Sequence, residues 1–526
     1  MPVVRVLRNG HFYTGWTAHP WATALALVGG KVAALDREAE LWADAPGAQL
    51  EDLGGATAIP GLTDAHIHLM WYALSLKELN LRDLSRSAML GAVRERASRI
   101  PPGEWILGRG WDQNLWEDSR FPSAGELDAV APVNPVMLIA KNAHALVANS
   151  LALRLGSITS QTADPPHGRI GRDATASPDG MLYEDAMAAV KQAVPPATRG
   201  ELLDLLEEAQ RHLLALGITS VHDVDGEPAL AAFQDLHQDQ RLRLRVVKYV
   251  RLESLDALLA AGIHSGLGDE WLRLGGLKLF ADGALGARTA AMAAPYLGEP
   301  DNVGILTLDP TQLREIAHRA AAGGLALAVH AIGDRANHLV LDVFESVRPL
   351  NARLRHRLEH VQLIAPEDQP RLSRLGVVAS MQPIHATHDR HMAEQYWGAR
   401  SLHAYAWRSL SRHATVLAFG SDAPIEIFDP FLGLYAAVTR RSEYAGESAE
   451  GAWYPEQCLS LEEALRAYTW GAAYAGGIEN THGALAPGMH GDLAVLDRDI
   501  FSEPPAALLE TRVSRVMVAG LWQDFG

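Results

Sequence analysis

The central part of the chain alternates short apolar strands with amphipathic helical segments, and this alternation limits the fold more than any other feature. It contains eight strand-like segments, which are 58–70, 218–224, 242–251, 273–283, 325–331, 355–361, 376–382 and 415–424. Helical patterns over 311–324, 337–347 and 367–376 lie between successive strands. Such alternation is typical of βαβ units and a parallel sheet, so eight repeats indicate an α/β fold with a TIM (β/α)8 barrel.

Three regions depart from this repeat. Roughly 145 residues separate the first strand from the second, which is too long for a loop and predicts a subdomain inserted at about 72–215 in a distorted barrel. Residues 1–58 and 480–526 alternate short β-rich runs with turns, and we expect these two ends to pair into one small β unit. The barrel would then occupy 59–479. A chain of 526 residues is long enough for more than one such unit.

Composition excludes several classes of protein. Acidic side chains outnumber basic ones by 63 to 46, which argues against nucleic acid or an anionic membrane as a partner. Cys458 is the single cysteine, so neither an intramolecular disulfide nor a cysteine metal cluster can form. The amino terminus lacks the pattern of a signal peptide, and no run of 18 apolar residues occurs. These features predict a cytoplasmic protein.

Lys278 is a misfit in its strand. In the segment "GGLKLFADGALGART" it lies between Leu277 and Leu279, which are residues that a buried strand favours. A lysine is almost never fully buried without a partner. One interpretation is a plain ion pair with Asp282, which follows at the end of the strand.

Residues that can bind a metal recur where the predicted strands end. Active sites of TIM barrels lie at the carboxyl ends of the strands. The residues found at or near these ends are His66, His68, Lys278, His330, His360 and Asp422. Residues 66 and 68 point to the same side of a strand, so both imidazoles can reach one metal.

Each of these residues has a structural interpretation when taken alone. With 22 histidines in the chain, chance alone supplies about one His-x-His pair, so the pair by itself carries little weight. His330 can be a core histidine, Glu359 and Gln362 can satisfy His360, and Asp422 can cap a turn. Their coincidence at separate strand ends favours a metal site.

These motifs together resemble the amidohydrolase superfamily, and within it the YtcJ-like group of metal-dependent hydrolases, amidohydrolase family 3. The resemblance rests on six segments in order, which are "PGLTDAHIH", "LKLFADGALGART", "VHAIGD", "LEHVQ", "FGSDAP" and "GDLAVLD". It covers essentially the whole chain. It implies that the β unit of the two ends is a β-sandwich and that the long insertion after strand 1 belongs to the fold.

The resemblance also implies a site for one or two divalent metals, with zinc as the expected ion. His66, His68 and Asp422 would hold the more buried metal, and His330 and His360 the second. Lys278 would bridge both as a carboxylated lysine that has captured carbon dioxide. Burial favours the neutral, reactive amine that this step requires. If Lys278 instead pairs with Asp282, the site would hold one metal.

Such a site predicts hydrolysis of a non-peptide, amide-type carbon–nitrogen bond in a small molecule by a metal-activated hydroxide. Asp422 would accept the proton of the attacking water and deliver it to the leaving nitrogen. The candidates for substrate contacts are Trp111, His144, Arg288 and Gln382. Arg288 would pair with a substrate carboxylate, although a structural ion pair is equally compatible with its position.

Two other functions stay open on the sequence. A mononuclear deaminase of a nitrogen heterocycle would hold one metal and have no carboxylated lysine, and a non-catalytic scaffold would hold none. The metal content of the chain would separate these functions. A homodimer is the default expectation for the assembly.

Overall fold

The computed structural model describes residues 2–113, 116–141, 145–166, 168–443 and 451–525. The chain forms two compact units. The first contains Met1–Tyr72 together with Leu206–Gly526, and the second contains Ala73–Leu205. The second unit therefore falls between the first and second strands of the barrel in the chain order.

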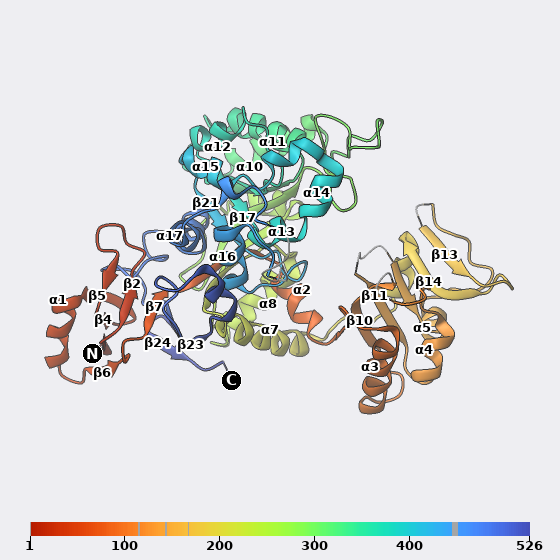
Figure 1. Ribbon diagram of the computed structural model, residues 1–526, viewed down its shortest axis with the longest axis horizontal. Helices are drawn as coiled ribbons and strands as arrows, with labels where there is room; N and C mark the ends of the chain where they lie inside the picture. Colours follow the sequence, from red (N-terminus) through yellow and green to blue (C-terminus); the bar gives the residue numbers. More distant parts are fainter. Residues whose placement is uncertain (1, 114–115, 142–144, 167, 444–450, 526) are drawn as a thin grey trace. The chain divides into compact units, whose positions relative to one another are not determined.

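A parallel eight-stranded sheet forms the barrel of the first unit (Figure 1). Its neighbours follow the chain order, and each adjacent pair is parallel. The strands are β8 (Leu62–Ile67), β15 (Ile218–Asp223), β16 (Arg245–Arg251), β17 (Leu272–Phe280), β18 (Ala326–Ala331), β19 (Arg357–His360), β20 (Val378–Met381) and β21 (Leu417–Phe419). The predicted fold class, a distorted TIM barrel, is confirmed.

Helices on the outside of the barrel form where the sequence supplies both a cap and an apolar face. Helix α10 (Pro310–Ala322) begins with a capping box, in which the Asp309 side chain accepts from the Gln312 amide while Gln312 bonds back to Asp309. Helix α11 (Asp334–Val347) follows β18, and both helices contact that strand. The buried residues of α11 repeat at helical spacing, and they include Val340, Leu341, Phe344 and Val347.

Other helices of the barrel unit lie between its strands or follow the last strand, β21, and three of them lie between β20 and β21. They are α8 (Glu227–Gln238), α9 (Leu255–Ala260), α12 (Gln369–Leu375), α13 (Pro383–His388), α14 (Arg390–Trp397), α15 (Trp407–Arg412), α16 (Pro430–Thr439), α17 (Leu461–Arg466) and α18 (Ala472–Gly476). Helix α7 (Arg199–Leu214) precedes β15 and carries residues of both units.

Strands β8 and β21 end next to each other, and backbone hydrogen bonds join the segments that follow them. The amide of His68 donates to the carbonyl of Ala423 over 2.9 Å, and the amide of Asp422 donates to the carbonyl of His66 over 2.7 Å. The first and last strands of the barrel therefore present His66, His68 and Asp422 at one place on the rim.

Two further sheets of the first unit are built from strands near the ends of the chain, and only the second of them combines strands from both ends. One has the order β5-β4-β1-β6 and is built from β1 (Val4–Arg8), β4 (Leu25–Val28), β5 (Lys31–Leu35) and β6 (Gln49–Asp52). The other has the order β24-β23-β22-β7-β2-β3, and its strands are β2 (His11–Tyr13), β3 (Trp21–Ala22), β7 (Thr57–Pro60), β22 (Leu493–Leu496), β23 (Val513–Val518) and β24 (Leu521–Gln523). Apolar side chains from both sheets pack into one core, as a β-sandwich requires.

The second unit is an α/β subdomain with its own core. Its sheet has the order β13-β14-β12-β11-β10-β9 and consists of β9 (Leu79–Asn80), β10 (Ile106–Trp111), β11 (Val136–Ala140), β12 (Ala145–Ala148), β13 (Gly168–Arg172) and β14 (Pro178–Glu184). Its helices include α3 (Arg86–Arg99), α4 (Ala124–Val130) and α5 (Ser150–Leu155). This core identifies the insertion as a folded body rather than a loop.

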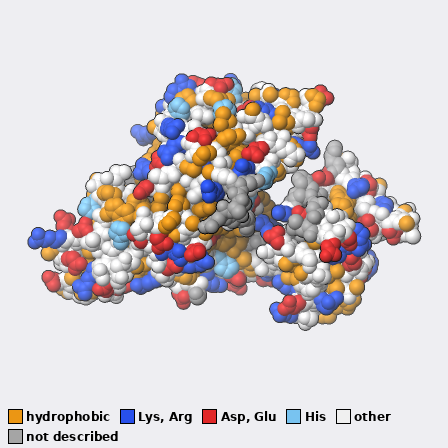
Figure 2. Space-filling model, in the orientation of Figure 1, with side chains coloured by type: hydrophobic (Ala, Val, Ile, Leu, Met, Phe, Trp, Pro, Cys, Tyr) orange, Lys and Arg blue, Asp and Glu red, His pale blue; other side chains and the backbone are white. Residues whose placement is uncertain are grey.

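Charged side chains of both signs are interspersed on the face of the molecule drawn in Figure 2. Within the described part of the chain, no helix combines the length and the apolar character that crossing a membrane requires.

Candidate metal centre

Four histidines and one aspartate predicted from the sequence meet at the carboxyl end of the barrel. His66 lies next to the end of β8 and His68 just beyond it, whereas His330 lies in β18 and His360 ends β19. The rings of His66 and His360 are 4.9 Å apart, and those of His330 and His360 are 4.6 Å apart. Asp422 follows β21. Residues far apart in the sequence thus form one cluster.

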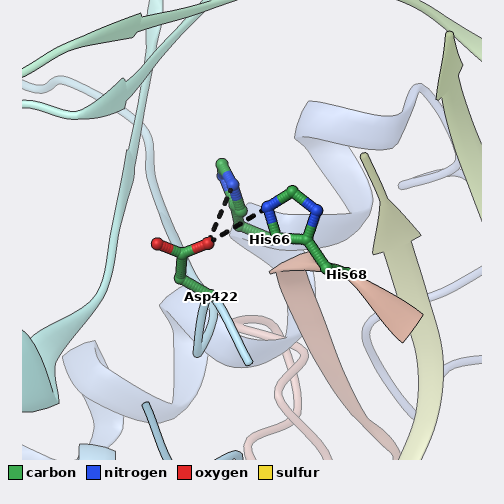
Figure 3. Close-up of side chains that lie close together, drawn as sticks. All are labelled: His66, His68 and Asp422. Carbon is green, nitrogen blue, oxygen red and sulfur yellow. Dashed lines mark ion pairs between the residues drawn. The ribbon is translucent and has the colours of Figure 1, made fainter. Parts of the chain in front are cut away.

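His66, His68 and Asp422 form the most compact part of this cluster (Figure 3). Nε2 of His66 and Nε2 of His68 each lie 3.5 Å from Oδ1 of Asp422. Ligand atoms at about 2.0–2.2 Å from a tetrahedral zinc lie roughly 3.3–3.6 Å from one another. The spacing of these three groups therefore fits a divalent metal with nitrogen and oxygen ligands.

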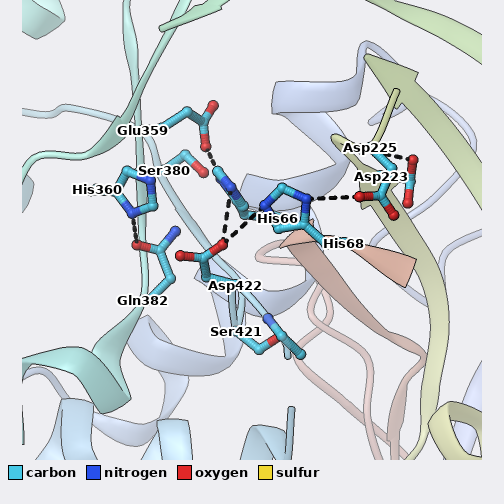
Figure 4. Close-up of polar contacts among 12 residues, drawn as sticks. His66, His68, Asp223, Asp225, Glu359, His360, Ser380, Gln382, Ser421 and Asp422 are labelled. Carbon is cyan, nitrogen blue, oxygen red and sulfur yellow. Dashed lines mark hydrogen bonds and ion pairs between the residues drawn. The ribbon is translucent and has the colours of Figure 1, made fainter. Parts of the chain in front are cut away.

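Each of the four histidines has one ring nitrogen held by an oxygen acceptor, and Figure 4 shows His66, His68 and His360 with their acceptors. Nδ1 of His66 donates to Glu359 over 2.5 Å, and Nδ1 of His68 donates to Asp225 over 2.9 Å. Nδ1 of His360 donates to Oε1 of Gln382 over 2.8 Å.

His330 is held through the other nitrogen of its ring, since Nε2 donates to the carbonyl of Gly283 over 2.9 Å. Because a carbonyl or a carboxylate only accepts, the bonded nitrogen carries the proton and the opposite nitrogen keeps its lone pair. This is the state that metal-ligating histidines adopt, with an acceptor fixing both tautomer and ring orientation.

Burial keeps three of the imidazoles, those of His66, His330 and His360, neutral. Burial, assisted by the charge of Lys278, lowers the pKa of His66 to about 4, and the same two causes lower the pKa of His330 to about 4. The pKa of His360 falls well below its usual value, again mainly because of burial. A neutral imidazole is the form that binds a metal.

A buried ion pair supports the cluster from inside the barrel. Arg357 and Glu359 lie on the same face of β19, and the Arg357 guanidinium donates to both oxygens of Glu359. It also bonds to Ser380 and to Nδ1 of His222. Burial would raise the pKa of Glu359, but Arg357 and His66 outweigh it and hold that pKa well below its usual range. Glu359 is therefore an anion that orients His66.

Lys278 is buried at the centre of the same region without a hydrogen-bond partner for Nζ among the described residues. Burial lowers its pKa to about 8, while Glu359 and Asp422 act in the opposite direction. The ion pair with Asp282 that the sequence left open is not formed. Asp282 instead accepts hydrogen bonds from the amides of Ala291, Ile332 and Gly333.

Two of the clustered residues have left-handed backbone conformations. The φ angle is 74° at His360 and 62° at Asp422, and neither residue is glycine. Such conformations persist where the surroundings hold them, and they concentrate at functional sites. Asp64 helps to fix the backbone next to Asp422, because it accepts hydrogen bonds from the amide and the hydroxyl of Ser421 over 3.0 and 2.5 Å.

Three of the four predicted substrate contacts have other roles in the structure or fall outside it. Trp111 is fully buried in the core of the second unit and donates to the carbonyl of Leu138 over 2.9 Å, so it has the position of a core aromatic residue. Arg288 is exposed and forms an ion pair with Glu299, which is the structural contact that the sequence left open for it. His144 lies outside the described residues. Gln382 lies in the site and orients His360.

Sequence reasoning missed several residues of the site. Glu359 was considered as a partner of its neighbour His360, but it bonds to His66. Asp225, which orients His68, follows β15 and has no histidine beside it in the sequence. His385 in α13 also joins the cluster, since ligand atoms of His360, His385 and Asp422 all lie within 4.8 Å of one another. The sequence "QPIHATHD" after β20 was the available signal.

A barrel rim that carries histidines and an aspartate at these strand ends defines a metal-dependent hydrolase of the amidohydrolase type. The family model described as "Amidohydrolase family" matches residues 49–521. The chain belongs to this family, and it is an amidohydrolase, a class of enzyme that acts on carbon–nitrogen bonds other than peptide bonds.

Relatives of the chain cover nearly its whole length. It is 32% identical to the protein LONG AFTER FAR-RED 3 of Arabidopsis thaliana, over 95% of this chain and 88% of that protein. It is 32% identical to the putative amidohydrolase YtcJ of Bacillus subtilis, over 89% of each chain. An N-substituted formamide deformylase of Arthrobacter pascens is 29% identical, over 95% of this chain and 94% of that enzyme.

Among solved structures, the chain resembles an uncharacterized metal-dependent hydrolase from Pyrococcus horikoshii. The two share 30% sequence identity with a TM-score of 0.81, and the match covers 95% of this chain and 99% of the other. The barrel, the sandwich and the inserted unit are therefore a shared architecture.

Proposed function

We propose that this amidohydrolase cleaves a small, non-peptide amide by hydrolysis at a zinc centre on the barrel rim. The observation that supports the proposal most is that four clustered histidines each have one ring nitrogen held by an oxygen acceptor, which leaves the other nitrogen available as a ligand. His66, His68 and Asp422 would hold one metal, and His330 and His360 a second. Lys278, in its carboxylated form, would bridge the two.

Bound divalent metals would supply a water that is acidic near neutral pH and would polarise the substrate carbonyl. The protein's own groups would control the rest of the reaction. Glu359, Asp225 and Gln382 hold the rings of His66, His68 and His360 in fixed orientations. This fixed geometry removes the need to reorganise the site during the reaction.

Asp422 would move the proton. Its Oδ1 lies 3.5 Å from both His66 and His68, so a water held at this place would be next to the carboxylate. Asp422 would accept one proton from the attacking water and deliver it to the amide nitrogen as the carbon–nitrogen bond breaks. The products would be a carboxylate and an amine, and the added water would account for all their new atoms.

N-substituted formamides are the first class of substrate to test, because a relative that aligns over 95% of this chain is an N-substituted formamide deformylase. The mononuclear deaminase of a nitrogen heterocycle is the alternative. The compact set of His66, His68 and Asp422 supports it, since these three groups alone can hold one metal. A cytoplasmic location and a homodimer remain proposals from the sequence.

Metal analysis joined to one substitution tests this proposal. We expect about two zinc ions per chain, and we expect Asp422→Asn to lower kcat for an N-substituted formamide by about 10³-fold while the fold is kept. Asp301→Asn, which changes an exposed carboxylate, is the control and should leave kcat unchanged. One metal per chain with release of ammonia from a heterocycle would favour the deaminase, and full activity of Asp422→Asn would remove Asp422 from proton transfer.

A further inference from the structure

His385 is a buried polar residue of the site that none of the proposed steps uses. It lies in α13, directly after β20, and it is 6% exposed. Its Nε2 atom is buried and has no hydrogen-bond partner in the described part of the chain. Its ring is parallel to that of His360, with centroids 6.2 Å apart.

Gln382 carries a donor without a partner in the same turn as His385. Its Oε1 atom accepts from Nδ1 of His360, which leaves the amide nitrogen to find another partner. That nitrogen, Nε2 of Gln382, is also buried without a hydrogen-bond partner among the described residues. Since the amide of His385 donates to the carbonyl of Gln382, the two residues belong to one turn.

Two buried side-chain nitrogens of one turn therefore lack a hydrogen-bond partner among the described residues. A buried donor without a partner destabilises a protein by about 1–3 kcal/mol, so most buried polar groups are bonded. At a site, a bound ligand or an ordered water can supply the acceptor that such a donor needs. An amide nitrogen of glutamine only donates, and Nε2 of His385 donates when it carries the ring proton, so one ligand atom that bonds to both nitrogens is an acceptor such as oxygen.

The geometry points to a subsite in which His385 and Gln382 donate hydrogen bonds to the carbonyl oxygen of the substrate. This inference rests on the proposed amide hydrolysis and names the atom that the subsite recognises. The subsite opens onto the reacting centre, because a ring nitrogen of His385 lies within 4.8 Å of Asp422 and of His360. The oxygen gains negative charge as water adds to the carbonyl carbon, so donors at this place bind the transition state more tightly than the substrate.

His385 is the better residue for an experiment, because Gln382 also holds His360 and its loss would disturb the metal ligands. His385→Phe keeps the ring volume and removes the donor, whereas His385→Gln restores a donor. His391→Ala changes an exposed histidine of the next helix and serves as the control. The substrates are N-benzylformamide and its thioformamide analogue, since sulfur is a weaker acceptor than oxygen.

We expect His385→Phe to lower kcat/KM for N-benzylformamide by about 10²-fold with zinc content unchanged, and His385→Gln to recover most of the loss. For the thioformamide the loss should shrink to less than about 10-fold. Loss of zinc in parallel with activity, or an equal loss on both substrates, would overturn the inference.

Binding without turnover separates this inference from the proposed function. In calorimetry on the zinc-free protein, N-benzylformamide should bind the wild type about 5–10-fold more tightly than His385→Phe, as one hydrogen bond predicts. Equal affinities would overturn the subsite. If the affinities differ but the zinc-loaded wild type hydrolyses no amide, the proposed function fails and the subsite stands.

Discussion

Two buried lysines on neighbouring strands of the barrel have opposite surroundings. Lys248 in β16 donates from Nζ to Asp223 over 2.6 Å and to the carbonyl of Tyr249 over 2.8 Å. Lys278 in β17 has no hydrogen bond from Nζ to any described residue. Both side chains are almost completely buried, with 0% and 1% of their surface exposed.

The difference shows how the same residue type serves two purposes in one barrel. Lys248 is a satisfied cation, and its partner Asp223 also receives the amide of Leu69, so the pair ties β15 and β16 to the segment after β8. Lys278 is an unsatisfied amine whose pKa burial lowers to about 8. A lysine with a lowered pKa supplies the neutral amine that reacts with carbon dioxide.

The largest expected effect is on catalysis, when Lys278 is replaced. Lys278→Ala should lower kcat by about 10³-fold, roughly 4 kcal/mol, because the bridge between two metals would be lost. Zinc content should fall below two ions per chain, and a short carboxylic acid such as propionate should restore part of the activity. Unchanged zinc content and no restoration would contradict a carboxylated Lys278.

The next effect is on stability. Lys248→Met should lower the free energy of unfolding by about 3–5 kcal/mol, because it leaves the carboxylate of Asp223 buried without its cation. Urea unfolding monitored by circular dichroism measures this change. Lys77→Met, which removes an exposed ion pair with Glu201, is the matched control and should change stability by less than about 1 kcal/mol. If both variants lose a similar free energy of unfolding, the buried pair of Lys248 and Asp223 contributes no more to stability than an exposed ion pair.

The smallest effect is a pH dependence of stability that arises from Lys278. Its pKa falls from 10.5 in the unfolded chain to about 8 in the fold, so between these values the unfolded state binds more protons. The stability of the zinc-free wild type relative to Lys278→Met should therefore rise from about pH 8 to about pH 10.5.

The total gain should be about 3 kcal/mol, since one pKa unit corresponds to about 1.4 kcal/mol. Below pH 8 the variant should be the more stable protein, because the wild type then carries a buried unpaired charge. A flat difference over this range would mean that Lys278 is not desolvated as the structure indicates.

The predicted strands and most of the clustered residues follow from periodicity. Apolar segments alternating with helical patterns predict a barrel, and barrel sites lie at the carboxyl ends of strands, which brings His66, His330 and His360 into one group. His385 escaped this reasoning because it lies in a helix after the strand rather than at the strand end.

The partners of the histidines depend on long-range contacts that no local pattern reveals. Glu359 precedes His360, yet neighbours on a strand point to opposite faces, so Glu359 shares a face with Arg357 and reaches His66 across the barrel. Arg288 and Trp111 lie in segments that the sequence marks as candidates for substrate contacts. In the structure, Arg288 forms an exposed ion pair and Trp111 packs into the core of the second unit.

The sequence by itself determined the class of fold, the place of the insertion and the residue types that stand at the ends of the strands, because hydrophobic periodicity is a local property of the chain. Only the tertiary structure decided that Lys248 is paired, whereas side-chain nitrogens of Lys278, Gln382 and His385 have no hydrogen-bond partner among the described residues. Whether a buried group is paired depends on the side chains that come into contact when distant strands close into a barrel. The free energy of a buried charge depends on these contacts and not on its neighbours in sequence.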